Sequence, residues 1–321
     1  MNLFQLDEQD NSRINSLLAH LTVQYESPCN PLFLQEARVL SSRLPEPLMS
    51  RLNAFRYHED HNGLLMLRGF EVDDRQIGPT PNATGKEIDE QSAAREGFLL
   101  MLLASFLGDS LGWANQRNGA LLNNVLPLKD HESEQLSTGS VADLSWHNEE
   151  AFHPFRADYL ALMCLRNPDN IPTLVGSIQD VHIPVEIKEI LFEPRFIFHT
   201  DKNFDQGETY VPVPEPVLFG DFKAPYVRLD PAFMSPAPGD EAADRALTYI
   251  IDAFDSALRK VPLTSGDILF MDNYRVVHGR KGFKPRFDGN DRWLKRVNIT
   301  LDLRKSRAVR PGQRSHVIIT D

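Results

Sequence analysis

Residues 145–154 read SWHNEEAFHP, and this segment decides how the rest of the chain is interpreted. On an extended backbone successive side chains point to opposite faces, so His147 and Glu149 would face the same way. A histidine and a carboxylate two residues apart on one strand can bind one metal ion from one side. The pair alone is a weak signal, because polar residues also alternate on solvated strands. A third ligand must come from elsewhere in the chain.

The third ligand predicted from the sequence is His278, in the segment Gly266–Arg280 (GDILFMDNYRVVHGR). This segment reads as a glycine turn, an apolar strand, a polar corner and a histidine directly before another glycine. A structural histidine lies more often inside an apolar run than after it. Two histidines and one carboxylate are typical of non-haem Fe(II) oxygenases, although the same ligand types also bind Zn(II), Mn(II) and Co(II). His153, directly before Pro154, is expected to be structural or to support the ligands from outside.

The composition is that of an ordinary soluble globular protein, with 321 residues, 41% of them hydrophobic and 25% charged. The net charge of −11 argues against a general nucleic-acid binder, which needs a basic face. Cys29 and Cys164 are the two cysteines and form no CxxC motif, so a reducing compartment is expected. The N-terminal residues do not read as a signal peptide, and the most apolar run, 98–107, is about half a membrane span. We therefore expect a cytoplasmic protein without a membrane partner.

Apolar periodicity divides the chain into a helical first part and a strand-rich remainder. Helices are predicted within residues 10–55, which prolines divide, and at 91–111, 184–192 and 239–260, with a loop at 75–90. Strands are predicted at 63–70, 121–128, 159–165, 173–178, 195–199, 215–219, 226–229, 267–272 and 294–303. Many short strands with turn signals between them predict a mainly β barrel or jelly roll, with helices packed outside it.

No internal repeat, low-complexity segment or clear linker divides the sequence, so we expect residues 1–321 to form a single domain. In this interpretation residues 1–60 are a helical N-terminal extension. Residues 61–305 are the jelly-roll core with inserted helices, and residues 306–321 are a C-terminal tail.

A candidate anion site follows His278 in the sequence. Arg292 and Arg296 would point to one side of a predicted strand. A guanidinium that points into the cavity of a compact barrel would pair bidentately with the carboxylate of a small acid. The alternative is an ordinary surface cluster, since Lys281, Lys284, Arg286 and Arg304 are close in sequence.

Four motifs in this order resemble the clavaminate synthase-like group of Fe(II)/2-oxoglutarate-dependent oxygenases. They are WHNEEAF at 146–152, LRNPD at 165–169, VHGR at 277–280 and DRWLKR at 291–296. The likeness runs from about residue 60 to 305 and is greatest to members that hydroxylate free basic amino acids, such as the arginine 3-hydroxylase of viomycin biosynthesis.

The resemblance implies a distorted double-stranded β-helix in which His147, Glu149 and His278 bind Fe(II). It also implies that Arg292 binds the distal carboxylate of 2-oxoglutarate, with Thr173 assisting and Arg296 nearby. 2-Oxoglutarate and O2 would be co-substrates, and hydroxylation of an unactivated carbon would release succinate and CO2.

Substrate residues are implied in the same way. Relatives that act on arginine hold the amino acid head with a glutamine and an arginine, which here look like Gln116 and Arg296. Glu149 is implied to contact the amine as well as the metal. Asp201 and Asp230 look like two of the acidic residues that hold the side chain of arginine in that relative.

The chain departs from this pattern after Asp230, which is followed by Pro231 and Ala232, whereas the arginine enzyme has a second acid two positions on. A single carboxylate suits the point charge of a lysine ammonium better than a guanidinium fork. The sequence therefore favours L-lysine as the substrate, with L-arginine second.

Other functions stay open at this point. A Zn(II)-dependent hydrolase could use the same His147, Glu149 and His278 ligands, although it leaves Arg292 and Thr173 without a shared role. A non-catalytic jelly-roll protein, an oxygenase acting on a neutral amino acid and a desaturase are further alternatives. The free amino acid is the one partner expected, and the sequence is also compatible with a homo-oligomer.

Overall fold

The computed structural model describes residues 1–59, 61–81, 93–199 and 213–319. At its centre is a large sheet with the strand order β1-β2-β13-β6-β15-β3-β16, in which β4 also pairs with β15. The pairs β1–β2 and β3–β16 are parallel, and the other pairs are antiparallel. The strands span Asn2–Gln5 (β1), Leu64–Arg68 (β2), Asp109–Trp113 (β3), Leu122–Val125 (β4), Tyr159–Arg166 (β6), Ile268–Asp272 (β13), Trp293–Thr300 (β15) and Val317–Ile318 (β16).

A second, smaller sheet faces the large one, with the strand order β12-β7-β14-β5. Its strands span Leu144–His147 (β5), Pro172–Ser177 (β7), Arg259–Pro262 (β12) and Val276–Arg280 (β14). One buried cluster joins Leu64 and Met66 of β2 with Val175 of β7 and Val276 of β14, so it fills the space between the sheets. Two facing sheets around an apolar core confirm the predicted mainly β jelly roll.

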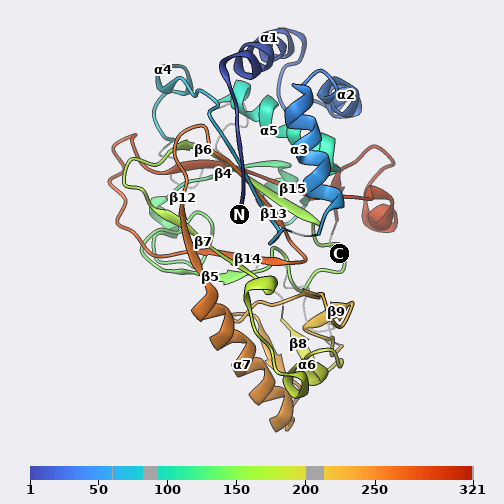
Figure 1. Cartoon of the computed structure of the whole chain (residues 1–321). Helices are drawn as coiled ribbons and strands as arrows, with labels where there is room; N and C mark the ends of the chain where they lie inside the picture. Colours follow the sequence, from blue (N-terminus) through green and yellow to red (C-terminus); the bar gives the residue numbers. More distant parts are fainter. Residues whose placement is uncertain (60, 82–92, 200–212, 320–321) are drawn as a thin grey trace.

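Helices cover the other face of the large sheet (Figure 1). They are α1 (Glu8–Gln24), α2 (Pro31–Ser41), α3 (Glu46–Tyr57) and α5 (Ala94–Leu107). Leu65 and Leu67, which alternate with the residues of the inter-sheet core, pack into the helical cluster instead. The central helix is α5, whose residues Phe98–Ala104 are all buried because it lies between the sheet and the other helices. The N-terminal helices therefore pack outside the jelly roll, as predicted.

Two helices and two antiparallel strand pairs form a lower part next to the small sheet (Figure 1). The helices are α6 (Val185–Leu191) and α7 (Glu241–Ala257), and the pairs are β8 (Phe196–Phe198) with β11 (Met234–Pro236) and β9 (Leu218–Gly220) with β10 (Pro225–Val227). A separate apolar cluster holds these elements together and includes Trp146, next to His147. This cluster therefore reaches the segment that carries the predicted metal motif.

Several predicted boundaries were wrong. The predicted helix 91–111 ends at Leu107, and Asp109–Trp113 forms β3, because Gly108 lies against β15 and a Cβ there would meet the carbonyl oxygen of Thr300 at 2.3 Å. The predicted loop 75–90 overlaps a short helix, α4 (Asp74–Ile77), which the side chain of Asp73 caps. The strand with the metal motif ends at His147, so Glu149 lies in the turn that follows it.

Both ends of the chain also contribute strands to the large sheet. β1 precedes the N-terminal helices and pairs with β2, so residues 1–60 are not purely helical. β16 lies within the predicted C-terminal tail and pairs with β3. Neither pairing has a local sequence signal, because the partners lie far away in the chain.

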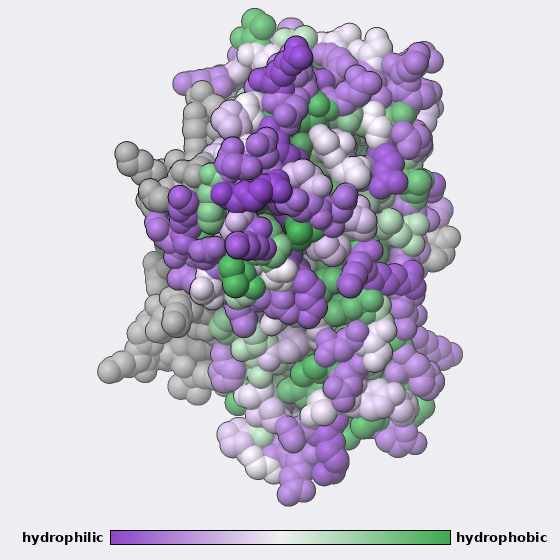
Figure 2. Space-filling view, turned by 90° about the vertical axis from the view of Figure 1, so that its left-hand side faces the viewer, coloured by the Kyte–Doolittle hydropathy of each residue, from purple (hydrophilic) through white to green (hydrophobic). Residues whose placement is uncertain are grey.

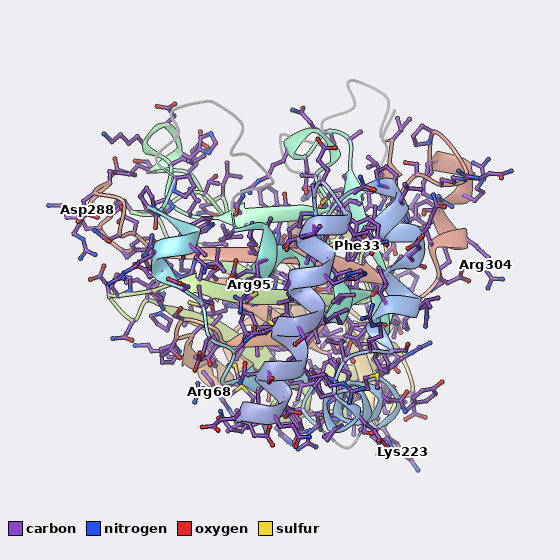
Figure 3. The ribbon with its side chains drawn as sticks, turned by 90° about the horizontal axis from the view of Figure 1, so that it is seen from above. Phe33, Arg68, Arg95, Lys223, Asp288 and Arg304 are labelled. Carbon is purple, nitrogen blue, oxygen red and sulfur yellow. The ribbon has the colours of Figure 1, made fainter. Side chains whose placement is uncertain are left out.

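On the face shown in Figure 2, hydrophilic residues dominate and hydrophobic residues lie in small groups between them. Seen from above in Figure 3, Phe33 lies among the helices, whereas Asp288, Arg304 and Lys223 lie at the periphery. Within the part of the chain that the structure describes, no helix has both the length and the apolar character needed to cross a bilayer.

Candidate active site

Strand pairing brings His147 and His278 together. β5 ends at His147 and runs antiparallel to β14, so that His147 lies opposite His278. The centres of the two imidazole rings are 4.7 Å apart. Gly279 permits this approach, since a Cβ there would lie 2.8 Å from the carbonyl oxygen of Leu144 and 2.9 Å from the Cα of Trp146. The glycine that follows His278 in the sequence is thus required by the pairing.

Glu149 completes a group of three ligand-type side chains. Its Oε2 lies 3.7 Å from Nε2 of His147 and 3.4 Å from Nε2 of His278. One candidate ligand atom from each residue lies within 4.8 Å of the others. Nδ1 of His147 is 2.7 Å from the carbonyl oxygen of Ser145, which can only accept, so Nδ1 carries a proton and Nε2 is the nitrogen available to a metal once its own proton has left. Two imidazole nitrogens and one carboxylate oxygen that converge in this way fit a divalent transition metal.

The charges of this group depend on one another. Burial opposes a charge on His147, but the carboxylates of Glu149 and Asp230 outweigh burial and raise its pKa to about 9. Burial lowers the pKa of His278. Burial also opposes ionisation of Glu149, but Arg296 and the two imidazoles hold its pKa well below the ordinary value. Without a metal, His147 is therefore the protonated member of the group at neutral pH, and a metal must displace that proton.

Arg292 is a buried cation next to this group. It lies directly before β15 with only 6% of its surface exposed, and Nη2 donates to Oγ1 of Thr173 at 3.3 Å. Among the described residues, its Nε has no hydrogen-bond partner and no carboxylate lies within ion-pair distance of its guanidinium. Burial lowers the pKa of Arg292 to about 10, so the side chain stays charged at neutral pH and is suited to an anion from outside the protein.

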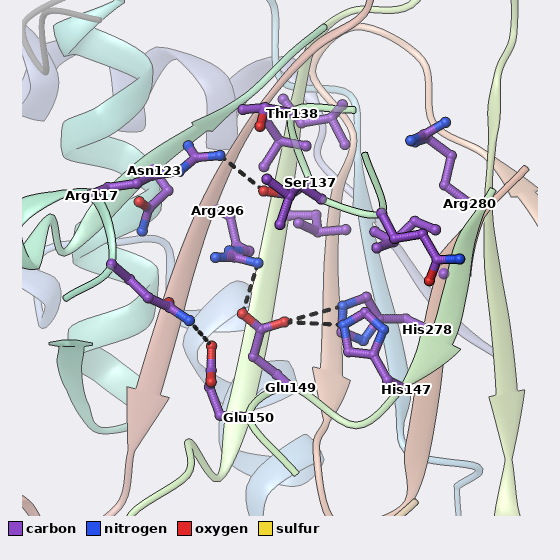
Figure 4. A pocket seen from close by; sticks show the side chains of 18 of the residues that line it. Arg117, Asn123, Ser137, Thr138, His147, Glu149, Glu150, His278, Arg280 and Arg296 are labelled. Carbon is purple, nitrogen blue, oxygen red and sulfur yellow. Dashed lines mark hydrogen bonds and ion pairs between the residues drawn. The ribbon is translucent and has the colours of Figure 1, made fainter. Parts of the chain in front are cut away.

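Arg296 and Gln116 each lie against an acidic side chain, and Figure 4 shows the pair of Arg296 with Glu149. Nη1 of Arg296 lies 2.7 Å from Oε1 of Glu149, in an ion pair without hydrogen-bond geometry. Nε2 of Gln116 donates to Oε1 of Glu150 at 2.6 Å. Glu149 thus lies between the imidazoles on one side and a guanidinium on the other, with a second carboxylate next along the chain.

A single cavity of about 720 Å³ joins these groups. Its wall contains every predicted site residue that the structure describes, namely Gln116, His147, Glu149, Thr173, Asp230, His278, Arg292 and Arg296. Oδ1 of Asp230 accepts from the backbone N–H of Ala232 at 3.2 Å, and Ala232 and Phe233 also line the cavity. Asp201, the other predicted substrate acid, lies outside the described residues.

Three charged residues of the cavity wall, Arg117, Glu150 and Arg280, were not predicted as site residues from the sequence. Arg117 donates to the carbonyl oxygen of Asn124 and, at 2.9 Å, to the hydroxyl of Ser137. Burial, followed by the charge of Arg296, lowers the pKa of Arg117 to about 10. Arg117 and Glu150 have positive φ angles of 44° and 52°, which L-residues with large side chains rarely adopt, so no sequence pattern would have revealed how they point. In the sequence, only the fact that Arg117 follows Gln116 and Glu150 follows Glu149 indicated that these two residues could belong to the site.

Comparison with known proteins identifies relatives that match almost the whole chain. Residues 190–298 match the family described as taurine catabolism dioxygenase TauD, TfdA family. The chain is 40% identical to enduracididine beta-hydroxylase of Streptomyces hygroscopicus, over 98% of both proteins. It is 37% identical to L-ornithine/L-arginine 3-hydroxylase of Catenulispora acidiphila, over 99% of this chain and 100% of that protein. L-lysine 3-hydroxylase of the same organism is 29% identical, over 87% of this chain and 78% of that protein.

The structure is similar to that of the non-heme iron oxygenase OrfP. The complex of OrfP with Fe, succinate and (3S)-hydroxy-L-Arg has a TM-score of 0.92 at 36% identity, covering 99% of this chain and 100% of that chain. The complex of OrfP with Fe and alpha-ketoglutaric acid has a TM-score of 0.92 at 39% identity, covering 98% and 99%. This likeness confirms the predicted double-stranded β-helix.

Proposed function

The chain belongs to the TauD/TfdA family of Fe(II)/2-oxoglutarate oxygenases, among clavaminate synthase-like relatives, and we propose from this premise that it hydroxylates a free basic L-amino acid. The enzyme is an amino acid hydroxylase that uses Fe(II), 2-oxoglutarate and O2. One observation carries the proposal for this chain: a single cavity joins three metal-type ligands with a buried guanidinium that has no carboxylate partner among the described residues. A zinc hydrolase would leave that guanidinium without a role.

We assign iron binding to Nε2 of His147, Nε2 of His278 and Oε2 of Glu149. The convergence of these three atoms supports the assignment, as does the carbonyl of Ser145 that fixes the tautomer of His147. These three residues would hold the metal from one side and would leave room for the co-substrates.

We assign the distal carboxylate of 2-oxoglutarate to Arg292 and Thr173. A carboxylate at this point would accept hydrogen bonds from the guanidinium and from the hydroxyl of Thr173, and it would neutralise a buried charge that has no counterion among the described residues. The 2-oxo acid end would then point along the cavity toward the metal ligands.

We assign the amino acid head to Gln116 and Arg296, with Glu149 next to the amine. The ion pair between Arg296 and Glu149 supports this arrangement, because a zwitterionic head offers one partner to each side chain. The far end of the substrate is assigned to Asp230, a carboxylate that lines the same cavity. Asp201 remains a proposal from the family resemblance alone.

The preferred substrate class changes when the relatives are considered. The single acid at Asp230 favoured lysine, but the relatives that match at 40% and 37% identity are named for enduracididine and for ornithine and arginine, and the lysine 3-hydroxylase matches at 29%. We therefore propose a guanidino amino acid such as L-arginine as the first substrate to test, with L-lysine second.

The bound iron and 2-oxoglutarate supply the oxidising chemistry, and the residues of the chain determine where it acts. Arg292 fixes the orientation of the co-substrate through its far carboxylate. Arg296 and Gln116 fix the substrate head, and Asp230 fixes its cationic end. With both ends held, one side-chain carbon would be kept near the metal ligands and the others away from them. Such positioning is the main contribution that a protein makes to this kind of reaction.

The site is tested by adding Fe(II) and 2-oxoglutarate without oxygen and measuring the weak visible charge-transfer band of the chelate. We expect the band in the wild-type protein, its loss in His278→Ala, and its retention in His182→Ala, which removes an exposed histidine that does not line the cavity. Absence of the band in the wild type would contradict the assignment of the site.

The substrate is tested with a panel of free L-amino acids scored for succinate and for a product heavier by one oxygen atom. Turnover of arginine, or of lysine, is expected to be lost in Asp230→Asn. If both are inert and a neutral amino acid turns over, the role assigned to Asp230 is wrong.

A further inference from the structure

Two buried asparagines lie directly behind the metal ligands. Asn148 sits between His147 and Glu149 and is fully buried, and Asn273 is 1% exposed in the turn between β13 and β14. Neither belongs to the wall of the cavity, so neither can touch a substrate there. They share no position with the ligand, co-substrate and substrate residues assigned above.

The amide of Asn148 uses each of its hydrogen atoms. Nδ2 donates to the carbonyl oxygens of Asn273 and Val276 at 2.8 and 2.9 Å, and Oδ1 accepts from the N–H of Leu229 at 2.8 Å. The backbone N–H of Asn148 also donates to the carbonyl oxygen of Leu229 at 2.9 Å. Asn148 therefore connects the segment that carries His147 and Glu149 to two other segments. One is the turn before His278, and the other is the segment that contains Leu229 and Asp230.

The side-chain amide of Asn273 forms hydrogen bonds with the backbone of Glu149. Oδ1 accepts from the N–H of Glu149 at 2.8 Å, and Nδ2 donates to the carbonyl oxygens of Glu149 and Ala157 at 2.9 Å each. Glu149 follows the end of β5, so no strand pairing fixes its backbone. The two hydrogen bonds from Asn273 take the place of the strand pairing that Glu149 lacks, because β5 ends at His147.

These contacts join the three metal ligands and Asp230 into one frame. His278 lies two residues after Val276, and Asp230 lies directly after Leu229. A buried polar network whose members are all satisfied is rigid, whereas a network that loses one member leaves buried N–H and C=O groups without partners. The amide pair can therefore hold the ligands in place before a metal binds.

We propose that Asn148 and Asn273 are positioning residues that preorganise the three metal ligands and fix the distance between the metal site and Asp230. The second half of this inference rests on the proposed function, because it gives Asp230 the cationic end of the substrate. A ligand set that is already in place binds metal more tightly, and a fixed Asp230 presents the same substrate carbon in every turnover.

The test compares Asn148→Ala and Asn273→Ala with the matched control Asn167→Ala. Asn167 also makes three side-chain hydrogen bonds to the main chain, to Ile171 twice and to Leu263, and it does not line the cavity. All three variants are expected to unfold at lower urea concentration. Only the Asn148 and Asn273 variants are expected to bind Co(II) or Fe(II) about tenfold or more weakly, measured anaerobically without substrate.

The second readout is the amount of hydroxylated amino acid formed per succinate released. It is expected to fall in Asn148→Ala and to match the wild type in Asn167→Ala. If Asn148→Ala does not fold, Asn148→Ser, whose hydroxyl can keep one of the bonds, is compared with the wild type in its place.

Wild-type metal affinity in a folded Asn148 variant would overturn the inference, whatever the substrate turns out to be. If the wild-type protein turns over no basic amino acid, the proposed function fails instead, and the metal titration still decides the role of the two asparagines.

Discussion

Arg292 is the residue on which the assignment of the co-substrate depends. We expect Arg292→Met to raise the KM for 2-oxoglutarate at least about 100-fold, since a charge-assisted bidentate pair contributes on the order of 3 kcal/mol. The variant should be no less stable than the wild type, because it removes a buried charge whose Nε has no partner among the described residues. Steady-state kinetics and urea unfolding measure the two effects.

Arg286→Met is the matched control for this substitution. Arg286 is an exposed arginine paired with Asp169 at 2.9 Å, and its loss should leave the KM for 2-oxoglutarate unchanged. An unchanged KM in Arg292→Met would contradict the anion site.

His147 makes metal binding depend on pH. Its pKa of about 9 in the metal-free protein means that a proton must leave before the metal binds. Metal affinity should therefore rise about tenfold per pH unit below that pKa and level off above it. Calorimetric titration in two buffers of different ionisation enthalpy should show the release of about one proton near neutral pH. Binding that is independent of pH, with no proton released, would show that His147 is not the protonated group.

At the scale of single residues, the chemistry could be predicted from the sequence but the exact geometry could not. Alternation along a strand correctly predicted that His147 and Glu149 point the same way. The strand itself ends at His147, however, and the turn after it brings the Glu149 side chain next to His147. The position of His278 before a glycine was a good signal, since the glycine permits the close strand pairing. The roles of Asn148 and Asn273 could not be predicted, because their partners come from distant segments.

Gly108 directly follows α5 and packs against Thr300 at the end of β15. A Cβ at this position would lie 2.3 Å from the carbonyl oxygen of Thr300, a backbone atom that cannot move without shifting the strand. We expect Gly108→Ala to lower the free energy of unfolding by about 2 kcal/mol or more. Gly312→Ala is the control, since a Cβ there would meet none of the described residues within 4 Å, and it should change stability by less than about 0.5 kcal/mol. Equal effects of the two substitutions in urea unfolding would contradict this packing.

Elements with strong local patterns were predicted well, and those defined by distant partners were not. The core strands β6 and β13 read as apolar runs because both faces are buried, and α5 reads as a continuous apolar helix for the same reason. β1 and β16 are short, half-exposed edge strands whose pairing depends on β2 and β3. Their few residues carry no periodicity from which an edge strand could be recognised.

The stability of the whole molecule should depend on the neutral form of His153. Burial, followed by the charge of Arg228, lowers the pKa of His153 to about 4, and its Nδ1 accepts from the N–H of Phe155 at 3.0 Å. Because the folded-state pKa lies below the ordinary value, this contribution is complete above about pH 6.5 and is lost as the pH falls toward 4. The loss should be on the order of 3 kcal/mol.

Unfolding by urea at a series of pH values measures this loss. In His153→Asn, whose amide oxygen can still accept from Phe155, the part of the pH dependence between about 6.5 and 4 should shrink. Identical pH profiles of the wild type and His153→Asn would exclude His153 as the cause.

One cavity, between the two sheets and the loop segments within 115–120, 128–138 and 230–233, holds three metal-type ligands, the buried guanidinium of Arg292 and the carboxylate of Asp230. The family and the reaction class followed from four short motifs, whereas the preference between lysine and arginine rested on a single missing acid. The names of the relatives at 40% and 37% identity led us to propose arginine ahead of lysine. One acid is a weak guide to the substrate, because the residues that select a substrate lie on connecting segments that vary within a common fold.

The most direct test of the central claim is turnover of L-arginine under oxygen-18 gas with Fe(II) and 2-oxoglutarate, followed by mass spectrometry. We predict an amino acid product that gains one atom of oxygen-18 and that forms in step with succinate, with both products lost in His278→Ala. A product without oxygen-18, or one that has lost two hydrogens and gained no oxygen, would contradict hydroxylation by this site.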